Sequence, residues 1–526
     1  MKASNLIAGI LMILFACKAP EQKRETTYER IEPFKISFQK RNLVTKLSRD
    51  TSYLEVFETD LDVLKRVVGA QLDEITLIVP NEIESETLEL DLSKIQILSS
   101  DFRVTVASTG STANIKQGVH YRGVIKDVER SHVAITIFEN EVSGLVTTDK
   151  GNFVIGRLAD VSSNNEHLIY DDRPVFLRQE FNCQLTTKAG VYDTKILLES
   201  PSVDQAVRNC IGIYLEADND IFVKKGGLQQ SADYVLALFN QVAMLYAIER
   251  INIVISELLI WDIESPYSGA SGQAMLDSFK ANTDEFNGEL AQLLSIDKGS
   301  GGVAEFAGVC HTNPDLKKSF SNIGSTFVDI PTYSWSVEVI AHELGHLFGS
   351  KHTQACVWNE DNTAIDGCAE PEEGTCPQPD IPSEGGTIMS YCHLTSVGIK
   401  FNLGFGAQPG NVIRNSVSTA ACCTCADGEV GDVLAAEGRI TLLRVHDVGT
   451  KYGPPSDELD VEVVVWLDNF PPRAFGFKLR STPDEKTHKA MLDQLRDTFN
   501  RNRRARIEYT KTGCQTGEIS RVIELM

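Results

Sequence analysis

The stretch HELGHLFGSKH, residues 342–352, decides the fold of this chain. His342 and His346 are four residues apart, so on a helix they share one face and both imidazoles can reach one ion. Gly349 stands where the helix must end, because glycine turns left-handed without a steric cost. That turn lets His352 approach as a third nitrogen ligand. Three protein ligands leave a fourth position open for water, which is the arrangement of a catalytic zinc.

Glu343 follows the first ligand and is placed to reach the water rather than the metal. Zinc lowers the pKa of such a water towards about 7. We therefore expect Glu343 to accept the water's proton during attack on a peptide carbonyl and to pass it to the leaving amine. A chance gathering of three histidines on an apolar helix is the competing interpretation, and the number of fixed positions disfavours it.

The extended motif resembles the signature of the metzincin zinc metalloproteases, in which a methionine-bearing turn follows the third histidine. The sequence GTIMSY, residues 386–391, is similar to that turn, and the resemblance implies that Met389 lies beneath the zinc. Among metzincins the chain resembles the adamalysin/reprolysin branch. This similarity rests on a candidate edge strand ending at Cys310, a cysteine-rich segment after the motif, and a terminal helix from about Asn411 into Cys422-Cys423.

The upstream region resembles a reprolysin propeptide in four short segments: HYRG (120–123), SHVA (131–134), GLV (144–146) and HLIY (167–170). The resemblance covers roughly residues 70–425. It implies a β-rich propeptide over 31–200 and a metzincin catalytic domain over 205–425, with a mixed twisted sheet and an active-site helix. The fold class expected is therefore multidomain α/β (α+β).

Two residues depart from the reprolysin pattern. Thr353 follows the third histidine, where typical reprolysins have Asp. Tyr391 lies two residues after Met389, where astacins and serralysins carry a tyrosine that approaches the zinc. Tyr391 is thus either a stabiliser of the oxyanion or a buried core residue.

Twelve cysteines indicate an oxidising compartment. A thiolate is a good zinc ligand, so we hypothesise that Cys183, in the propeptide, blocks the zinc as a cysteine switch. A disulfide to Cys210 competes with this hypothesis. By resemblance, Cys310 pairs with Cys422 or Cys423. The remaining disulfide candidates include four that the resemblance pairs among themselves, namely Cys356, Cys368, Cys376 and Cys392, together with Cys425 and Cys514. A zinc-thiolate cluster is the alternative for the segment 422–425.

The N-terminus is typical of an exported protein. Lys2 precedes an apolar run from Leu6 to Ala16 that is too short to span a bilayer but suits a signal peptide. The run ends in LFAC, which resembles a bacterial lipobox with Cys17 as the lipidated residue, so residues 1–17 are expected to be the leader and 18–30 a polar tether. We expect an outer-membrane or cell-surface lipoprotein, with plain secretion as the alternative.

The net charge of −23 disfavours nucleic acid as a partner, because phosphate backbones are held by clustered Lys and Arg. The expected partners are an extracellular protein or peptide substrate and, through the lipid anchor only, a membrane. Zinc is the one cofactor indicated; a structural calcium ion is compatible with the sequence but not indicated, and the oligomeric state is unknown. The competing function class is a surface binding or adhesion protein with a vestigial metal site.

Periodicity predicts the remaining elements. Short strands are expected in 31–180, at 75–79, 102–106, 132–137 and 153–155. In the catalytic region we expect strands at 211–215 and 253–261, helices at 229–250, 274–294 and 336–348, and an edge strand at 302–310. Residues 426–526 are expected to form a small β-rich barrel or sandwich with one helix at 486–500. The arginines at 501, 503, 504 and 506 are either a binding face or a solvated helix end.

Overall fold

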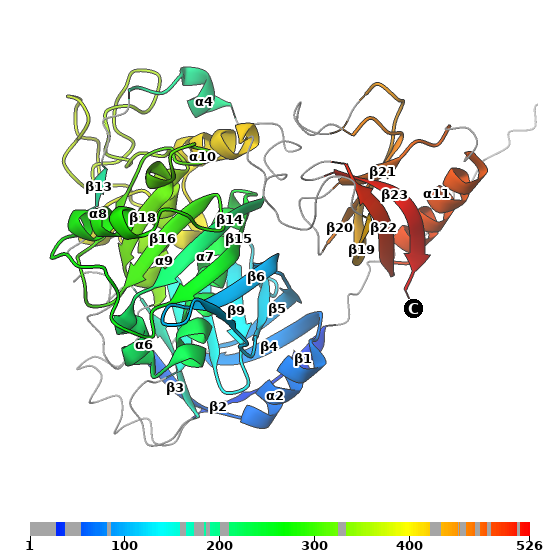
Figure 1. The fold of residues 1–526 in the computed structure, drawn as a ribbon, viewed down its shortest axis with the longest axis horizontal. Coiled ribbons are helices and arrows are strands. Elements are labelled where there is room, and N and C mark those ends of the chain that lie inside the picture. Colours follow the sequence, from blue (N-terminus) through cyan, green and yellow to red (C-terminus); the bar gives the residue numbers. More distant parts are fainter. Residues whose placement is uncertain are drawn as a thin grey trace, which may run out of the picture.

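A computed structural model describes most of the chain. The described residues are 28–36, 54–81, 86–157, 165–172, 183–185, 190–199, 210–323, 333–420, 433–450, 452, 459–468, 474–480, 485–512 and 516–525. The expected leader, Cys17 and residues 18–27 of the expected tether lie outside them, as do Cys422, Cys423, Cys425 and Cys514. The end of the tether is placed wrongly, because Glu29 and Arg30 already belong to a strand that pairs with residues 75–77. Figure 1 shows the chain as a large body with a smaller barrel beside it.

The N-terminal part is a ten-stranded half-barrel. Its strand order is β1-β4-β5-β8-β9-β10-β11-β12-β3-β2, and its neighbours are antiparallel except β1 with β4. The strands are β1 (Glu29–Ile31), β2 (Phe34–Ile36), β3 (Leu54–Thr59), β4 (Glu74–Asn81), β5 (Glu86–Lys94), β8 (Val119–Ile125), β9 (His132–Ile137), β10 (Val142–Thr147), β11 (Asn152–Arg157) and β12 (Glu166–Asp171). Helix α2 (Leu61–Ala70) begins at Asp60, whose side chain accepts from two backbone N–H groups of the first turn. The strands expected at 75–79, 132–137 and 153–155 are present.

The central sheet has the order β13-β17-β18-β16-β14-β15-β6-β7. Five of its strands come from the catalytic region: β14 (Cys210–Ala217), β15 (Asn252–Ile260), β16 (Leu290–Ser295), β17 (Gly302–Ala304) and β18 (Lys318–Asn322). The other three come from upstream and cover both edges: β6 (Leu98–Val106) and β7 (Ser111–Ala113) extend the sheet beyond β15, while β13 (Gln184–Leu185) pairs parallel to β17. The sheet thus mixes strands from both sides of the expected boundary near residue 200.

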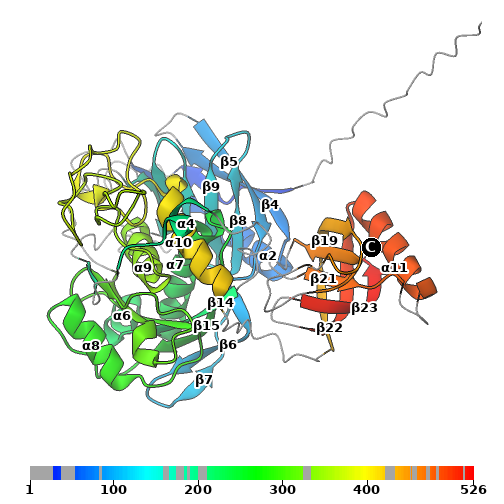
Figure 2. The ribbon, with the colours of Figure 1, turned by 90° about the horizontal axis from the view of Figure 1, so that it is seen from above.

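Three helices pack on this sheet and position the site. Helices α7 (Leu228–Ile248) and α9 (Tyr333–Leu347) contact each other, and α8 (Gly272–Asn282) packs on β17 and β18. Helix α10 (Ala407–Thr419) is the last described element of the catalytic region in the sequence. Two shorter helices, α6 (Asn219–Lys225) and α4 (Thr194–Leu198), lie at the periphery of this region (Figure 2). The prediction of a single helix over 274–294 is wrong. Helix α8 ends at Asn282, and residues 290–295 form strand β16. The edge strand expected over 302–310 is limited to β17.

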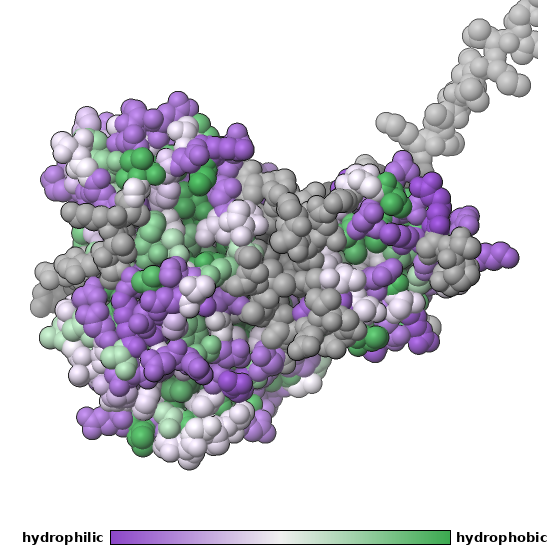
Figure 3. Space-filling view, turned by 45° about the horizontal axis from the view of Figure 1, so that its top comes forward, coloured by the Kyte–Doolittle hydropathy of each residue, from purple (hydrophilic) through white to green (hydrophobic). Residues whose placement is uncertain are grey.

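Helix α7 lies between the central sheet and the half-barrel. The amide of Asn240 donates to the carbonyl of Ile135 and to Thr136 Oγ1, both at 3.1 Å. Among the described residues α7 is the one helix long and apolar enough to cross a membrane, but most of it is buried inside the protein. The face seen in Figure 3 is mainly hydrophilic, with hydrophobic residues in scattered patches. One hydrophobic core includes residues of both the half-barrel and the catalytic region.

The C-terminal part is a closed five-stranded barrel of order β19-β20-β21-β23-β22. Its elements are β19 (Val433–Val445), β20 (Val463–Leu467), β21 (Ala474–Phe477), α11 (Glu485–Asn500), β22 (Arg504–Lys511) and β23 (Thr516–Glu524). The third and fifth strands are parallel and the helix lies between the third and fourth, which is the topology of the OB fold. Of the two expected forms, barrel or sandwich, the structure has the barrel, and the helix expected at 486–500 is α11.

The arginine cluster of the barrel does not form a free binding face. Arg503 pairs with Glu524, Arg504 with Asp73 of the half-barrel, and Arg506 with Glu437. Arg501 lies near Glu524 at 3.7 Å. These pairs favour the solvated helix-end interpretation, and Arg504 in addition joins the barrel to the larger body.

Candidate active site

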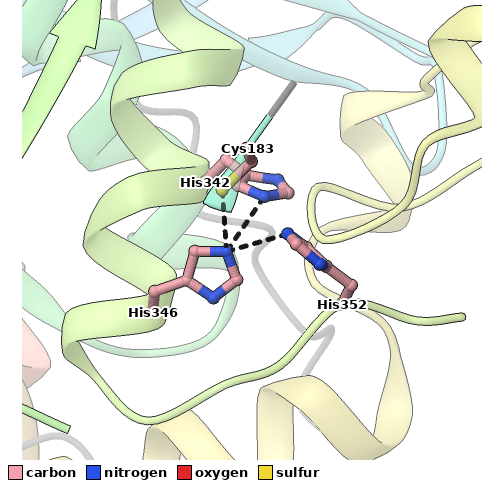
Figure 4. A group of neighbouring side chains, drawn as sticks. All are labelled: Cys183, His342, His346 and His352. Carbon is pink, nitrogen blue, oxygen red and sulfur yellow. Dashed lines mark hydrogen bonds between the residues drawn. The ribbon is translucent and has the colours of Figure 1, made fainter. Parts of the chain in front are cut away.

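Helix α9 presents two histidines to one point. The Nε2 atoms of His342 and His346 are 3.1 Å apart, and that of His352 is also 3.1 Å from His346 Nε2 (Figure 4). His352 arrives from the turn after α9, where Gly349 has a φ of +91°. All three imidazoles are buried. The structure therefore brings together the three histidines predicted as ligands.

The hydrogen bonds of the three rings fix their tautomers. His342 Nδ1 donates to the Ile388 carbonyl at 2.8 Å, and His346 Nδ1 donates to the Ser350 carbonyl at 2.7 Å. His352 Nδ1 lies 2.5 Å from Glu372 Oε1. Because each Nδ1 carries its proton toward an acceptor, each neutral ring presents an Nε2 lone pair to the common point. Burial lowers the pKa of His342 and of His346 well below its usual value, which keeps these two rings neutral.

Such a set of lone pairs fits a zinc ion. Nitrogen ligands at about 2.0–2.1 Å from a tetrahedral zinc lie about 3.3 Å from one another. The observed separations are close to this, and no protein donor can satisfy three converging acceptors. Cys183 Sγ lies 3.4 Å from His346 Nε2 and completes a group of four atoms able to hold a metal. The residues present therefore fit zinc.

Glu343 lies beside this group on α9. Its side chain is fully buried, Oε2 is 3.5 Å from Cys183 Sγ, and Oε1 has no hydrogen-bond partner among the described residues. Burial raises the pKa of the Glu343 carboxyl well above its usual value. A Cβ on Gly302, the first residue of β17, would lie 2.0 Å from Oε1, so only glycine leaves room there for the carboxylate.

The methionine turn supports the site through both its backbone and its side chain. Met389 is fully buried, and a Cβ on Gly345 would lie 2.6 Å from its sulfur, so the turn packs directly against α9. Its neighbour Ile388 supplies the carbonyl that orients His342. Thr353 donates its backbone N–H to the Met389 carbonyl at 3.1 Å. The hydroxyl of Thr353, the residue that departs from the reprolysin pattern, donates to the same carbonyl at 3.4 Å and also links the third ligand's segment to this turn.

Cys183 is a free, buried cysteine, so the disulfide to Cys210 that competed with the switch hypothesis is wrong. Burial, followed by the neighbouring Glu343 carboxylate, raises the pKa of its thiol well above the usual value. A zinc ion in the same place would favour the thiolate instead.

Tyr391 contacts the backbone of Cys183. Its hydroxyl donates to the Cys183 carbonyl at 3.0 Å and accepts from the Cys183 N–H at 3.1 Å. Its ring centroid is 4.8 Å from that of His352. Tyr391 is therefore a neighbour of the metal ligands, and its hydroxyl is held by the Cys183 segment.

The disulfides around the site are Cys356–Cys376 and Cys368–Cys392, so these four cysteines pair among themselves. Cys310 is also disulfide-bonded, and its expected partners lie outside the described residues. The segment 422–425, with its zinc-thiolate alternative, lies outside them too.

Sequence reasoning did not identify the residues that orient the ligands. Ser350 and Glu372 each accept from a ligand's Nδ1. Lys351 is fully buried and pairs with Glu373 at 2.6 Å, next to Glu372 in the chain. A polar cluster of Asp172, Glu338 and His393 is buried nearby. For Glu372, the acidic pair 372–373 inside a cysteine-rich loop was the available signal.

Comparison with known proteins agrees with this geometry. Residues 207–398 match metallo-peptidase family M12. The chain is 23% identical over 350 residues to the Homo sapiens disintegrin and metalloproteinase domain-containing protein 9, covering 62% of this chain and 39% of that protein. The chain thus spans well under half of that relative's length.

Among solved structures, metalloproteinase-II from Bacteroides fragilis matches with a TM-score of 0.34 and 14% identity, over 59% of this chain and 91% of that one. That structural score is too low to add to the assignment, which rests on the family match and on the site. The matched segment contains the three histidines, Glu343 and the methionine turn, so residues 207–398 of this chain are similar to the reprolysin-like metallopeptidases of family M12.

Proposed function

We propose that this protein is an exported zinc-dependent endopeptidase that the Cys183 segment holds latent. The observation that carries the proposal is the convergence of three Nε2 lone pairs beside a buried carboxylate with a vacant hydrogen-bonding oxygen. A binding protein with a vestigial metal site has no use for Glu343 at this position. The alternative function is therefore disfavoured.

Zinc bound by His342, His346 and His352 would supply Lewis acidity, which makes water more acidic and polarises a carbonyl. Glu343, next to the first ligand, takes the proton of the attacking water and delivers it to the leaving amine. Its buried position beside the first ligand supports this role, because a carboxyl group within reach of the reacting water can accept its proton and return it.

The edge strand β17 supports the use of extended peptides as substrates. In the structure β13, next to Cys183, pairs with it through Gln184 opposite Val303 and Leu185 opposite Ala304. A substrate strand would use the same backbone groups. In this proposal the Cys183 segment would offer its thiolate to the metal and would take the strand position of a substrate.

The half-barrel also contacts the segment 396–401, which we expect to wall the pocket after the scissile bond. Asn152 donates to the Ile399 carbonyl at 3.1 Å, and Lys400 donates to the Asp149 carbonyl at 2.8 Å. These contacts support a role of residues 31–200 in latency.

Tyr391 is proposed to stabilise the oxyanion once Cys183 leaves. Its hydroxyl then loses both of its present partners while its ring stays beside His352. A Tyr391→Phe variant of the activated enzyme should lose kcat with little change in KM. An unchanged kcat, or a fall in kcat accompanied by an equally large rise in KM, would instead show that Tyr391 is a core residue.

Export, the lipid anchor at Cys17 and an extracellular protein substrate are proposed from the N-terminal sequence and the disulfides. The C-terminal barrel is proposed to direct the enzyme to whole-protein substrates. Deleting residues 427–526 should then reduce cleavage of whole proteins but not of a short peptide.

The test of the proposed activity uses the zinc-loaded full chain, before and after activation, on casein and gelatin. Activity should require removal or mutation of Cys183, should disappear with a chelator, and should be absent from Glu343→Gln. A Cys183→Ser chain that stays latent would refute the switch. A zinc-loaded chain that has been activated by removal of the Cys183 segment and still cleaves none of several proteins would refute the endopeptidase proposal.

A further inference from the structure

Tyr192 lies upstream of the segment that matches family M12, yet its hydroxyl is bound to the zinc-binding turn. The hydroxyl donates to the Gly349 carbonyl at 2.8 Å and accepts from the Lys351 N–H at 2.9 Å. It therefore spans the residue between them, Ser350. The Ser350 carbonyl is the group that accepts from His346 Nδ1. One hydroxyl thus fixes the peptide that orients the second metal ligand.

The ring of Tyr192 also acts on the third ligand. It packs against the indole of Trp358, with ring centroids 4.9 Å apart. The indole N–H of Trp358 donates to the backbone carbonyl of His352 at 2.7 Å. Tyr192 is therefore linked to His346 through Ser350 and to His352 through Trp358.

The neighbours of Tyr192 bind the same surface. Lys351 Nζ donates to the Gly190 carbonyl at 2.8 Å. Further along, Asn411 of α10 donates to the Leu197 carbonyl at 2.7 Å, and Asn415 donates to the Glu199 carbonyl at 3.1 Å. Leu197 is buried in a small core together with Ala355, Val357, Trp358 and Val412. Residues 190–199 are thus packed onto the catalytic region by side chain and backbone alike.

We infer that Tyr192 is a positioning residue for the second and third zinc ligands, and that residues 190–199 stay with the catalytic domain after activation. Cys183 and β13 would leave, whereas the Tyr192 segment would remain as a brace under the metal-binding turn. Activation would then cut the chain before residue 190 rather than near residue 200. The inference rests on the proposed zinc site but not on peptidase activity.

The test compares Tyr192→Phe with a matched control in the full-length Cys183→Ser chain, where the three histidines hold the metal without the thiolate. Tyr192→Phe keeps the ring and loses both hydrogen bonds. The control is Tyr121→Phe in the half-barrel, which loses one buried hydroxyl bond, to the Leu72 carbonyl at 2.9 Å, far from the metal. Zinc affinity is measured by competition with a chromogenic chelator, and the cobalt-substituted proteins are compared by their visible absorption.

We expect zinc affinity to fall by about 3- to 10-fold in Tyr192→Phe and to change less than about 2-fold in Tyr121→Phe, since outer partners of metal ligands commonly tune affinity by about 10-fold or more when they touch the ligand directly. Tyr192→Ala should lose more than Tyr192→Phe because the contact with Trp358 also disappears. The cobalt spectrum should change in the Tyr192 variants alone. Equal zinc affinity in Tyr192→Phe and Tyr121→Phe would overturn the positioning role.

A second measurement is independent of the variants. The mass of the active species formed from the full-length chain gives its first residue, which should lie after Leu185 and no later than residue 190. An active species that begins outside this range would overturn the proposed boundary. If the Cys183→Ser parent itself binds no zinc, the proposed metal site fails, and this outcome is distinct from failure of the Tyr192 inference.

Discussion

The contact between His352 and Glu372 allows a quantitative prediction about metal binding. Glu372 Oε1 lies 2.5 Å from His352 Nδ1, and its side chain is 37% exposed. A hydrogen bond to a charged group contributes about 1.5–3 kcal/mol, and partial exposure to solvent argues for the lower end of that range. Since 1.4 kcal/mol corresponds to a factor of ten, Glu372→Ala should weaken zinc binding about 10-fold.

The assay is chelator competition in the full-length Cys183→Ser chain, so that the thiolate does not mask the effect. Glu372→Gln should lose less than Glu372→Ala, because the amide oxygen can still accept from Nδ1 while the charge is absent. Glu370→Ala is the matched control, since Glu370 is exposed in the same loop. Zinc affinity in Glu372→Ala equal to that in Glu370→Ala would refute the reasoning that this carboxylate orients the ligand.

Three further outcomes are expected. Gly302→Ala should abolish peptidase activity while zinc binding persists, because the new Cβ would overlap Glu343; activity above a tenth of the parent's would contradict this. Asn240→Ala should lower the free energy of unfolding by about 2 kcal/mol, measured by urea denaturation, because it removes the buried amide that donates to the Ile135 carbonyl and to Thr136 Oγ1. Burial raises the pKa of Asp233 to about 7, so between about pH 4 and 7 the folded state binds a proton that the unfolded chain does not, and stability falls as pH rises. Asp233→Asn should remove this part of the slope in stability against pH, and an unchanged slope would exclude Asp233 as its source.

The metal site was predictable from sequence because its residues are local. The spacing of His342 and His346 follows helix geometry, and Gly349 has the positive φ that a turn after the helix requires. Strands whose residues alternate between apolar and polar, or form a short apolar run, were also predicted correctly from this pattern. These features depend on residues only a few positions apart in the sequence, and over such short distances helix or strand propensity and the pattern of apolar residues are informative.

The error at residues 274–294 has a physical cause. Strand β16 is buried along its whole length within a largely parallel sheet, so its residues LAQLLS are mostly apolar and do not alternate with polar ones. Such a run cannot be told from a buried helix by period alone. The Asn287-Gly288 pair before it was the available sign of a break.

The partners of the ligands could not be read from the sequence, because each comes from a different segment. Glu372 lies in a loop fixed by two disulfides, and Tyr192 lies in a segment that the resemblance assigned to the propeptide. The pairing of β6 with β15 likewise joins residues some 150 positions apart. Nothing in the local pattern of either strand indicates its partner, since a strand's period gives its faces but not its neighbour.

Helix α7 shows that latency and folding are joined in this chain. A helix that is apolar on all sides must be buried on all sides, and the central sheet covers only one side of α7. The half-barrel covers the other, and the buried Asn240 is satisfied there by the backbone of β9 and by Thr136. Arg103 of β6 similarly neutralises the buried Glu257 of β15, with Thr105 donating to the same carboxylate at 2.6 Å. Without the upstream strands these groups would be left buried and unpaired or exposed to water. The half-barrel therefore completes the core of the catalytic region in addition to contacting the segment 396–401.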